Sequence, residues 1–164
     1  MQKQLRAHIY TDGACSGNPG KGGWAWVLHY NDQFKARSGF DLHTTNNQME
    51  MMAVIQALKF AAEMNLSVTL FTDSVYVKNG LLEWVKNWKK RNWLTADKKP
   101  VKNKELWMQL DLLFTQCNKN QEQVLIEWVK GHSCCVGNNI ADMIATCSVN
   151  HNQHNGCKCS KYLA

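Results

Sequence analysis

Strand-like and helix-like segments alternate along this 164-residue chain, and this alternation restricts it to a mixed α/β fold more than any other feature does. The strand-like segments are residues 8–12, 24–30, 34–39, 68–72 and 124–129. The turn residues Asn31 and Asp32 join the second segment to the third, which favours an antiparallel meander for the first three. Helix-like sequence precedes each of the last two, so we expect one domain with an α/β architecture.

Helical periodicity marks the segments between the later strands. Residues Thr45 to Gln48 fit a capping box, which predicts a helix that ends near Asn65, and Asn103 is expected to cap a second helix that runs through Cys117. The side chains expected to face the core are Met49, Met52, Ala53, Leu58 and Ala62 in the first helix and Leu106, Leu110, Leu113 and Phe114 in the second. Shorter helices are predicted at 74–82 (with Gly80 near its end), 82–91 and 138–149, and loops at 15–23, 92–102 and 131–137.

Positive charge is concentrated in residues 84–104, which we call the basic segment. It holds eight Lys and Arg side chains against Asp97 alone, a net charge of +7, so the rest of the +6 chain carries −1. A local patch of this kind favours docking to a polyanion. No apolar run approaches the roughly 20 residues needed to cross a bilayer, and the N-terminal residues lack the apolar stretch of a signal peptide. We therefore expect a cytoplasmic protein that makes no use of a membrane.

Two of the predicted strands end in the same dipeptide, Thr-Asp, at Asp12 and Asp73. Because ligands commonly bind at the carboxyl ends of strands in α/β sheets, neighbouring strands would bring these carboxylates together. Glu50 lies one turn into the first long helix, and Asp142 lies near the start of the last one. Four carboxylates at one point repel one another, and Mg²⁺ or Mn²⁺, which prefer oxygen ligands, would relieve that repulsion. The four acids are therefore a candidate two-metal site for phosphodiester chemistry.

Four motifs occur in order between residues 7 and 147. They are Tyr-Thr-Asp12-Gly-Ala-Cys-Ser-Gly-Asn-Pro-Gly20, Thr-Thr-Asn-Asn-Gln-Met-Glu50, Thr-Asp73-Ser, and Trp-Val-Lys-Gly-His132 with Asp142 ten residues later. Together they resemble ribonuclease H type 1, and residues 88–103 resemble the basic protrusion of its bacterial form. The resemblance implies a ribonuclease H domain over residues 1–150, with a five-stranded mixed sheet flanked by helices.

The same resemblance implies an endoribonuclease that hydrolyses the RNA strand of RNA–DNA hybrids, with water as the nucleophile, and leaves 5′-phosphate and 3′-hydroxyl ends. Asp12, Glu50, Asp73 and Asp142 match the metal-binding catalytic acids, with two Mg²⁺ ions as the cofactor and Mn²⁺ as a substitute. His132 matches the histidine of a mobile loop that assists proton transfer or product release. Histidine exchanges protons near neutral pH, which suits that role.

Substrate contacts are also implied by motif matches. The matching residues are Asn18, Asn46 and Gln48 near the RNA strand, Thr45, Asn87 and Asn103 around a DNA phosphate, Trp84 beside a DNA sugar, and Lys89, Lys90 and Arg91 in the basic segment. The 2′-hydroxyl group is what distinguishes RNA from DNA in such a site. Trp84 and Trp88 also have the i, i+4 spacing that ordinarily means packing on a helix.

Three positions depart from the family pattern. Val75 stands where Gln or Lys is frequent, Asn139 replaces the usual Glu, and the loop after His132 reads Ser-Cys-Cys-Val. These departures spare the four acids and bear on loop motion.

Other interpretations were weighed against the enzyme. A single Asp at a strand end is more often a turn former or helix cap, but the repeated Thr-Asp pattern disfavours that view. A catalytically silent hybrid-binding module is disfavoured by the complete set of acids. A related polynucleotidyl transferase or integrase-like nuclease is disfavoured by the basic segment and by the motif that ends at Glu50.

Seven cysteines without a secretory signal predict mostly reduced thiols. Residues 151–164 form a Cys/His-rich tail that is expected to be flexible. A zinc site made by Cys147, His151, His154, Cys157 and Cys159 is a less favoured alternative. Cys134 and Cys135 beside His132 leave a redox or zinc effect open next to simple loop filling. We expect a monomer whose partner is an RNA–DNA hybrid.

Overall fold

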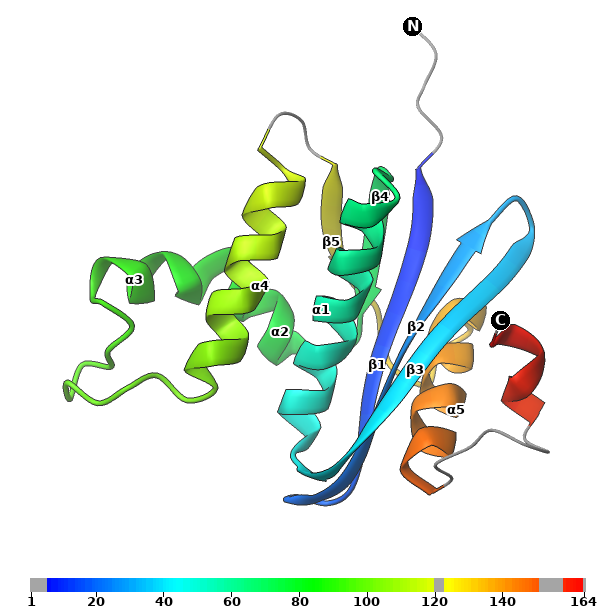
Figure 1. The fold of residues 1–164 in the computed structure, drawn as a ribbon, viewed down its shortest axis with the longest axis horizontal. Coiled ribbons are helices and arrows are strands. Elements are labelled where there is room, and N and C mark those ends of the chain that lie inside the picture. Colours follow the sequence, from blue (N-terminus) through cyan, green and yellow to red (C-terminus); the bar gives the residue numbers. More distant parts are fainter. Residues whose placement is uncertain (1–5, 120–122, 151–157, 164) are drawn as a thin grey trace, which may run out of the picture.

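The computed structural model describes residues 6–119, 123–150 and 158–163, and its centre is a five-stranded mixed sheet (Figure 1). The strands are β1 (Ala7–Gly17), β2 (Gly20–Tyr30), β3 (Gln33–Thr44), β4 (Val68–Thr72) and β5 (Val124–Trp128). Their order across the sheet is β3-β2-β1-β4-β5. β1, β2 and β3 pair antiparallel, whereas β4 and β5 run parallel to β1. This arrangement confirms the predicted α/β fold and its antiparallel meander.

The hairpin between β1 and β2 is longer than the sequence predicted. The expected loop at residues 15–23 is wrong, because pairing continues to Gly17 opposite Gly20 and leaves only Asn18 and Pro19 as the turn. Glycines in this stretch serve close packing: a Cβ on Gly23 would collide with the backbone of Ala145. The Asn31–Asp32 turn is confirmed, and both residues have positive φ angles, of 49° and 57°, as a tight hairpin turn requires.

Helices cover both faces of the sheet (Figure 1). On one face lie α1 (Asn46–Glu63) and α4 (Lys104–Cys117), and on the other lies α5 (Val136–Asn150). Thr45 caps α1 by accepting a hydrogen bond from the Gln48 N–H, as predicted. The expected buried position Ala62 is wrong, because it is exposed, and Met52 is only partly buried. α1 packs against both the sheet and α4, so its buried surface is wider than one stripe and includes Met51, Val54, Ile55, Ala57 and Ala61.

Residues 75–90 form one continuous helical run rather than the two predicted helices that meet at Leu82. α2 (Val75–Asn79) passes through a π-helical turn, η1 (Gly80–Trp84), into α3 (Val85–Lys90). Gly80 is required inside this run because a Cβ there would collide with the Trp107 ring. Trp107 is fully buried, although it was not predicted to face the core. Leu110, which was predicted to face the core, is also fully buried. Asn103 precedes α4 with a positive φ of 58° and makes no capping hydrogen bond, so its predicted capping role is wrong.

The C-terminal residues 158–163 pack against the sheet. They form a short 3₁₀ helix, η2 (Lys158–Tyr162), in which Cys159 is buried, and Leu163 forms a bridge with Ala36 of β3. This part of the tail therefore differs from the expected flexible segment, and His151, His154 and Cys157 lie outside the described residues. Cys147 is disulfide-bonded, an exception to the prediction of mostly reduced thiols, and Cys159 lies in the core under α5. Within the described part of the chain, no helix is long and apolar enough to cross a bilayer.

Candidate active site

Three carboxylates meet where β1, β4 and the start of α1 come together. Thr11 pairs with Thr72 across the parallel strands β1 and β4, so the next residue on each strand, Asp12 and Asp73, reach the same edge of the sheet. Glu50 arrives from α1, whose first turn rests on Gly13. A Cβ on Gly13 would collide with the Glu50 backbone nitrogen, so only glycine allows this approach.

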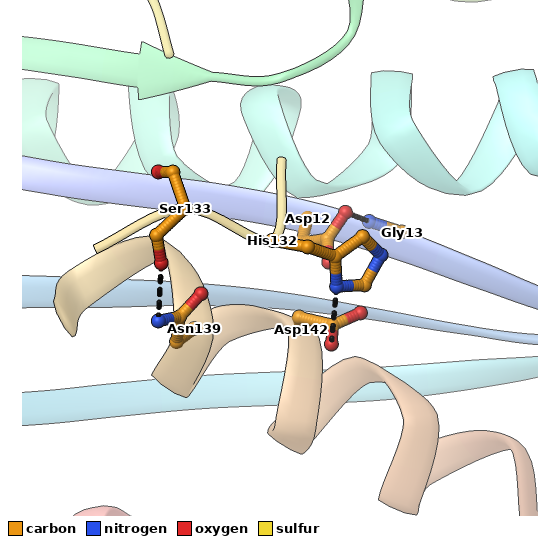
Figure 2. Close-up of polar contacts among 6 residues, drawn as sticks. All are labelled: Asp12, Gly13, His132, Ser133, Asn139 and Asp142. Atoms are coloured by element: carbon orange, nitrogen blue, oxygen red, sulfur yellow. Dashed lines mark hydrogen bonds and ion pairs between the residues drawn. The ribbon is translucent and has the colours of Figure 1, made fainter. Parts of the chain in front are cut away.

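These three side chains form a compact acidic cluster. One carboxylate oxygen from each of Asp12, Glu50 and Asp73 lies within 4.8 Å of the others. Asp12 is only 5 % exposed, and its Oδ1 accepts a hydrogen bond of 2.9 Å from the Gly13 N–H (Figure 2). Among the described residues this is the only group of His, Cys, Asp and Glu side chains with metal-ligand spacing.

The cluster makes negative charge costly. Burial, the largest cause, together with the charges of Asp73 and Asp142 raises the pKa of Asp12 to about 7, against a partly opposing hydrogen bond with Glu50. Burial and the charge of Asp12 raise the pKa of Glu50 well above its ordinary value. Burial also raises the pKa of Asp73. A cation between these groups would relieve both the desolvation and the repulsion.

One oxygen of the cluster has no partner of its own. Glu50 Oε2 is buried and makes no hydrogen bond with the described part of the protein. A buried acceptor left unpaired costs free energy, about 1–3 kcal/mol or more for a charged group. The cluster offers carboxylate oxygens, one of which has no hydrogen-bond partner. Oxygen ligands of this kind are the ones that Mg²⁺ and Mn²⁺ prefer. The residues present therefore fit a hard divalent cation.

Asp142 and His132 lie beside Asp12 (Figure 2), outside the group of three acids that have metal-ligand spacing. Asp142 belongs to the first half of α5, and its side chain is 40 % exposed. Its Oδ2 lies 4.0 Å from Nδ1 of His132. His132 has a positive φ of 53° and a side chain that is 86 % exposed. The structure thus brings the fourth acid and the histidine to the same edge of the sheet as the other three acids.

Asn138 is a site residue that the sequence reasoning missed. It is 1 % exposed, sits four residues before Asp142 on α5, and hydrogen-bonds the Asp73 carboxylate. Its Oδ1 is buried and has no partner among the described residues. The signal was present in the sequence, because an amide at i and an acid at i+4 lie on the same face of a helix.

The expected RNA-side and DNA-side residues are linked by hydrogen bonds. Gln48 Nε2 donates to Asn103 Oδ1 at 3.2 Å, and Asn103 Nδ2 donates to the Tyr76 hydroxyl at 3.1 Å. Gln48 Oε1 accepts from Thr44 at 3.0 Å, so this side chain does not close the predicted capping box. On the neighbouring hairpin, Asn18 Oδ1 accepts from the Asn46 N–H at 3.2 Å. Gln48 is therefore paired with Asn103, and Asn46 is paired with Asn18.

The basic segment rests on aromatic side chains. Trp84, Trp88 and Trp107 pack in tilted and edge-to-face pairs at ring-centroid distances of 5.5–6.4 Å. Trp84 therefore packs, yet it also lines a shallow depression of about 440 Å³ with Asn87, Trp88 and Arg91. The Lys89 ammonium is paired with Asp111 at 3.0 Å, whereas Lys90 and Arg91 have exposed side chains.

Comparisons with known proteins agree with this geometry. The family model described as RNase H matches residues 4–150. A ribonuclease H of Ruthia magnifica subsp. Calyptogena magnifica is 52 % identical over 137 residues, which cover 84 % of this chain and 90 % of that protein. A ribonuclease H of Bartonella tribocorum is 49 % identical over 154 residues, which cover 94 % of this chain and 96 % of that protein.

Solved structures share the same fold. The crystal structure of LC9-RNase H1, a type 1 RNase H with the type 2 active-site motif, superimposes with a TM-score of 0.73 at 26 % identity, covering 88 % of this chain and 72 % of that one. The solution structure of the PFV RNase H domain gives a TM-score of 0.72 at 26 % identity, covering 90 % and 96 %.

Proposed function

The chain belongs to the ribonuclease H family, and we propose that it uses Asp12, Glu50, Asp73 and Asp142 to hydrolyse the RNA strand of RNA–DNA hybrids. The single observation that carries this assignment of residues is the acidic cluster. Three acids share one small volume, their pKa values are raised, and one buried oxygen lacks a partner among the described residues. Such an arrangement lowers stability when no cation is bound, so its presence indicates a functional site that binds a cation.

Asp12, Glu50 and Asp73 would hold the divalent cations, with Asp142 completing the set from α5. Mg²⁺ is the proposed cofactor and Mn²⁺ a substitute, because both accept an all-oxygen ligand set. The chemistry that two such ions supply is activation of water as a nucleophile and stabilisation of charge on the leaving oxygen.

The protein's own groups orient the reaction. The Asp73 carboxylate is held by Asn138, and the Asp12 carboxylate is held by the Gly13 N–H, so both have fixed directions. We assign to His132 the transfer of a proton at the rim, with Asp142 as the carboxylate that its Nδ1 faces. The P–O3′ bond of the RNA breaks, which leaves a 5′-phosphate on one fragment and a 3′-hydroxyl on the other.

Recognition of the hybrid divides between two surfaces. Asn18, Asn46 and Gln48 are proposed to contact the RNA strand, where amide groups can bond the 2′-hydroxyls. Thr45, Asn87 and Asn103 are proposed to hold a DNA phosphate, and Trp84 to lie beside a DNA sugar. The cations of the basic segment supply attraction to the phosphate backbone without reading its sequence.

The proposed setting is a monomer in the cytoplasm. Every group assigned above comes from one chain, which supports a site that needs no second copy. Cys15, Cys117, Cys134 and Cys135 are free thiols, as a reducing compartment favours.

A hybrid-cleavage assay tests the function. End-labelled RNA–DNA hybrid, duplex RNA and duplex DNA are incubated with the protein, with and without Mg²⁺. We expect cleavage of the RNA strand of the hybrid only, dependent on Mg²⁺, with 3′-hydroxyl ends that a poly(A) polymerase can extend. Tight hybrid binding without cleavage in either Mg²⁺ or Mn²⁺ would instead favour a silent binding module.

A further inference from the structure

Two adjacent cysteines lie in the loop that carries His132. Cys134 is exposed and Cys135 is partly buried, and both are free thiols. Two other free thiols are less available: Cys117 is buried, and the partly buried Cys15 directs its Sγ to the Thr44 carbonyl at 3.5 Å. The catalytic scheme above makes no use of Cys134 or Cys135.

The Cys135 side chain is seated on β1. It contacts the Tyr10 hydroxyl through a hydrogen bond, and Tyr10 is two residues before Asp12. The start of α5 rests on the same ring, because a Cβ on Gly137 would collide with Tyr10. The Tyr10 ring itself is fixed by stacking on Phe71 at 4.9 Å. A group bonded to Cys135 Sγ would replace the thiol that makes this hydrogen bond.

The rest of the loop is short and tied at both ends. At its start, a Cβ on Gly131 would lie 2.7 Å from Asp73 Oδ2. At its end, Asn139 Nδ2 donates to the Ser133 carbonyl at 2.9 Å (Figure 2), and the Asn139 N–H donates to the Cys135 carbonyl at 3.0 Å. His132 lies between these two attachments, so lifting Cys135 off Tyr10 moves His132 relative to Asp142.

We propose that the Cys134–Cys135 pair is a modification site for low-molecular-weight disulfides, at which a group on Cys135 slows turnover by displacing His132. The cysteine thiol loses its proton and its sulfur attacks one sulfur of a disulfide RS–SR. A protein–S–SR bond forms, the RS–SR bond breaks, and the departing thiolate takes up the proton as RSH. The protein sulfur is oxidised and the departing thiol is reduced. Cys134 is the first point of contact from solvent, where an adduct disturbs little.

The test treats the full chain with oxidised glutathione and follows adducts by peptide mass spectrometry alongside kcat and KM on hybrid. This readout rests on the proposed function. We expect an adduct at Cys135 to lower kcat by about 10²-fold, the lower end of the loss when acid–base assistance is removed, with KM little changed. Dithiothreitol restores kcat.

Matched variants separate the two thiols. Cys134→Ser should remain sensitive, and Cys135→Ser, which keeps a hydroxyl to face Tyr10, should become insensitive. The proposal is overturned if Cys135→Ser is inhibited as strongly as the parent, or if an adduct at Cys135 leaves kcat unchanged. It is also overturned if the mass falls by two hydrogens, which marks a disulfide within the protein in place of an adduct. If Cys135→Ser folds poorly, Cys135→Ala takes its place, with melting temperature as the check.

Failure of this proposal is distinguishable from failure of the proposed function. Untreated protein that does not cleave hybrid contradicts the function. Hydrogen exchange across residues 131–137 still tests the site, because an adduct at Cys135 should accelerate exchange there. Unchanged exchange in the modified protein contradicts the proposal.

Discussion

The acidic cluster and the basic segment differ in how strongly their like charges repel one another. At the cluster, Asp12 is buried and Glu50 and Asp73 are partly buried, and the three acids are crowded together, so that the pKa of each is raised. In the basic segment, Lys90 and Arg91 are exposed to solvent beside tryptophans that pack against one another. Like charges in water repel weakly, whereas like charges in a buried site repel strongly.

The acidic cluster therefore sets the chemistry, and the basic segment sets the affinity for substrate. The cluster depends on exact neighbours, and one changed atom alters the charge of the whole group. The basic segment depends on summed charge over several phosphates, so that single changes have graded effects.

The largest expected effect is on Asp12. Asp12→Asn should abolish detectable cleavage, a greater loss than the about 10²–10⁴-fold that acid–base assistance contributes, because a metal ligand is removed from the cluster. Steady-state kinetics on hybrid in Mg²⁺ is the measurement, with Asp32→Asn in the β2–β3 turn as the matched control. Near-parental turnover of Asp12→Asn would contradict the metal assignment.

The same substitution should stabilise the metal-free protein. The pKa of Asp12 rises from 3.8 to about 7 on folding, so the folded state holds more protons between these values. The free energy of unfolding therefore falls as pH rises from about 4 to about 7. Melting temperatures of Asp12→Asn and parent in chelator should coincide below pH 4 and diverge by a few degrees above pH 7. Divergence in the opposite direction would contradict the repulsion argument.

His132→Ala should slow turnover by about 10²–10⁴-fold and leave activity measurable, because it removes proton transfer and spares the metal ligands. The pH–rate profile should lose one limb. If His132→Ala is as inactive as Asp12→Asn, the histidine has another role.

Asn138→Ala should lower kcat or Mg²⁺ affinity by about 10–100-fold, the usual cost of removing a residue that orients a metal ligand. Asn138→Asp, which has the same size but adds charge beside Asp73, should be no better. The exposed Thr146→Ala, farther along the same helix, is the control. An unchanged Mg²⁺ titration and kcat for Asn138→Ala would limit its role to structure.

Neutralising the basic segment should affect binding alone. Lys90→Gln with Arg91→Gln should raise KM and reduce the log–log salt slope by roughly 0.9 for each phosphate that is no longer neutralised, if B-DNA behaviour transfers to hybrids. Lys89→Gln should change the slope less, because its ammonium is paired with Asp111. Equal slopes for parent and double variant would mean that these charges are merely solvated.

Truncation after Asn150 should have the smallest effect on activity. Removing Cys159, Tyr162 and Leu163 uncovers apolar surface on the β3 side of the sheet, with a decrease in the free energy of unfolding of about 1–3 kcal/mol, or roughly 2–8 °C in melting temperature. Hybrid cleavage should persist, since all assigned acids precede residue 143. Stoichiometric zinc in protein purified without chelator would revive the zinc-site alternative for the tail.

The sequence by itself determined the strands and helices that follow simple local rules. A run of β-branched and apolar residues predicted the strand at 68–72 to the residue, and the Thr45 cap predicted the start of α1. The repeated Thr-Asp ending also predicted that Asp12 and Asp73 would meet if their strands were neighbours, and the parallel pairing of β1 with β4 confirms that they are.

Only the tertiary structure decided what depends on packing between distant segments. Gly80 lies inside a helix, where the Trp107 ring occupies the space that a side chain would need. Gly23 lies in β2, where a Cβ would collide with the backbone of α5. Asn103 binds Gln48 and Tyr76 instead of capping α4, and Cys159 is buried under α5. Each outcome is set by the chemistry of residues on another element of the fold, which no local pattern contains, whereas strand alternation and helix capping act within a few residues.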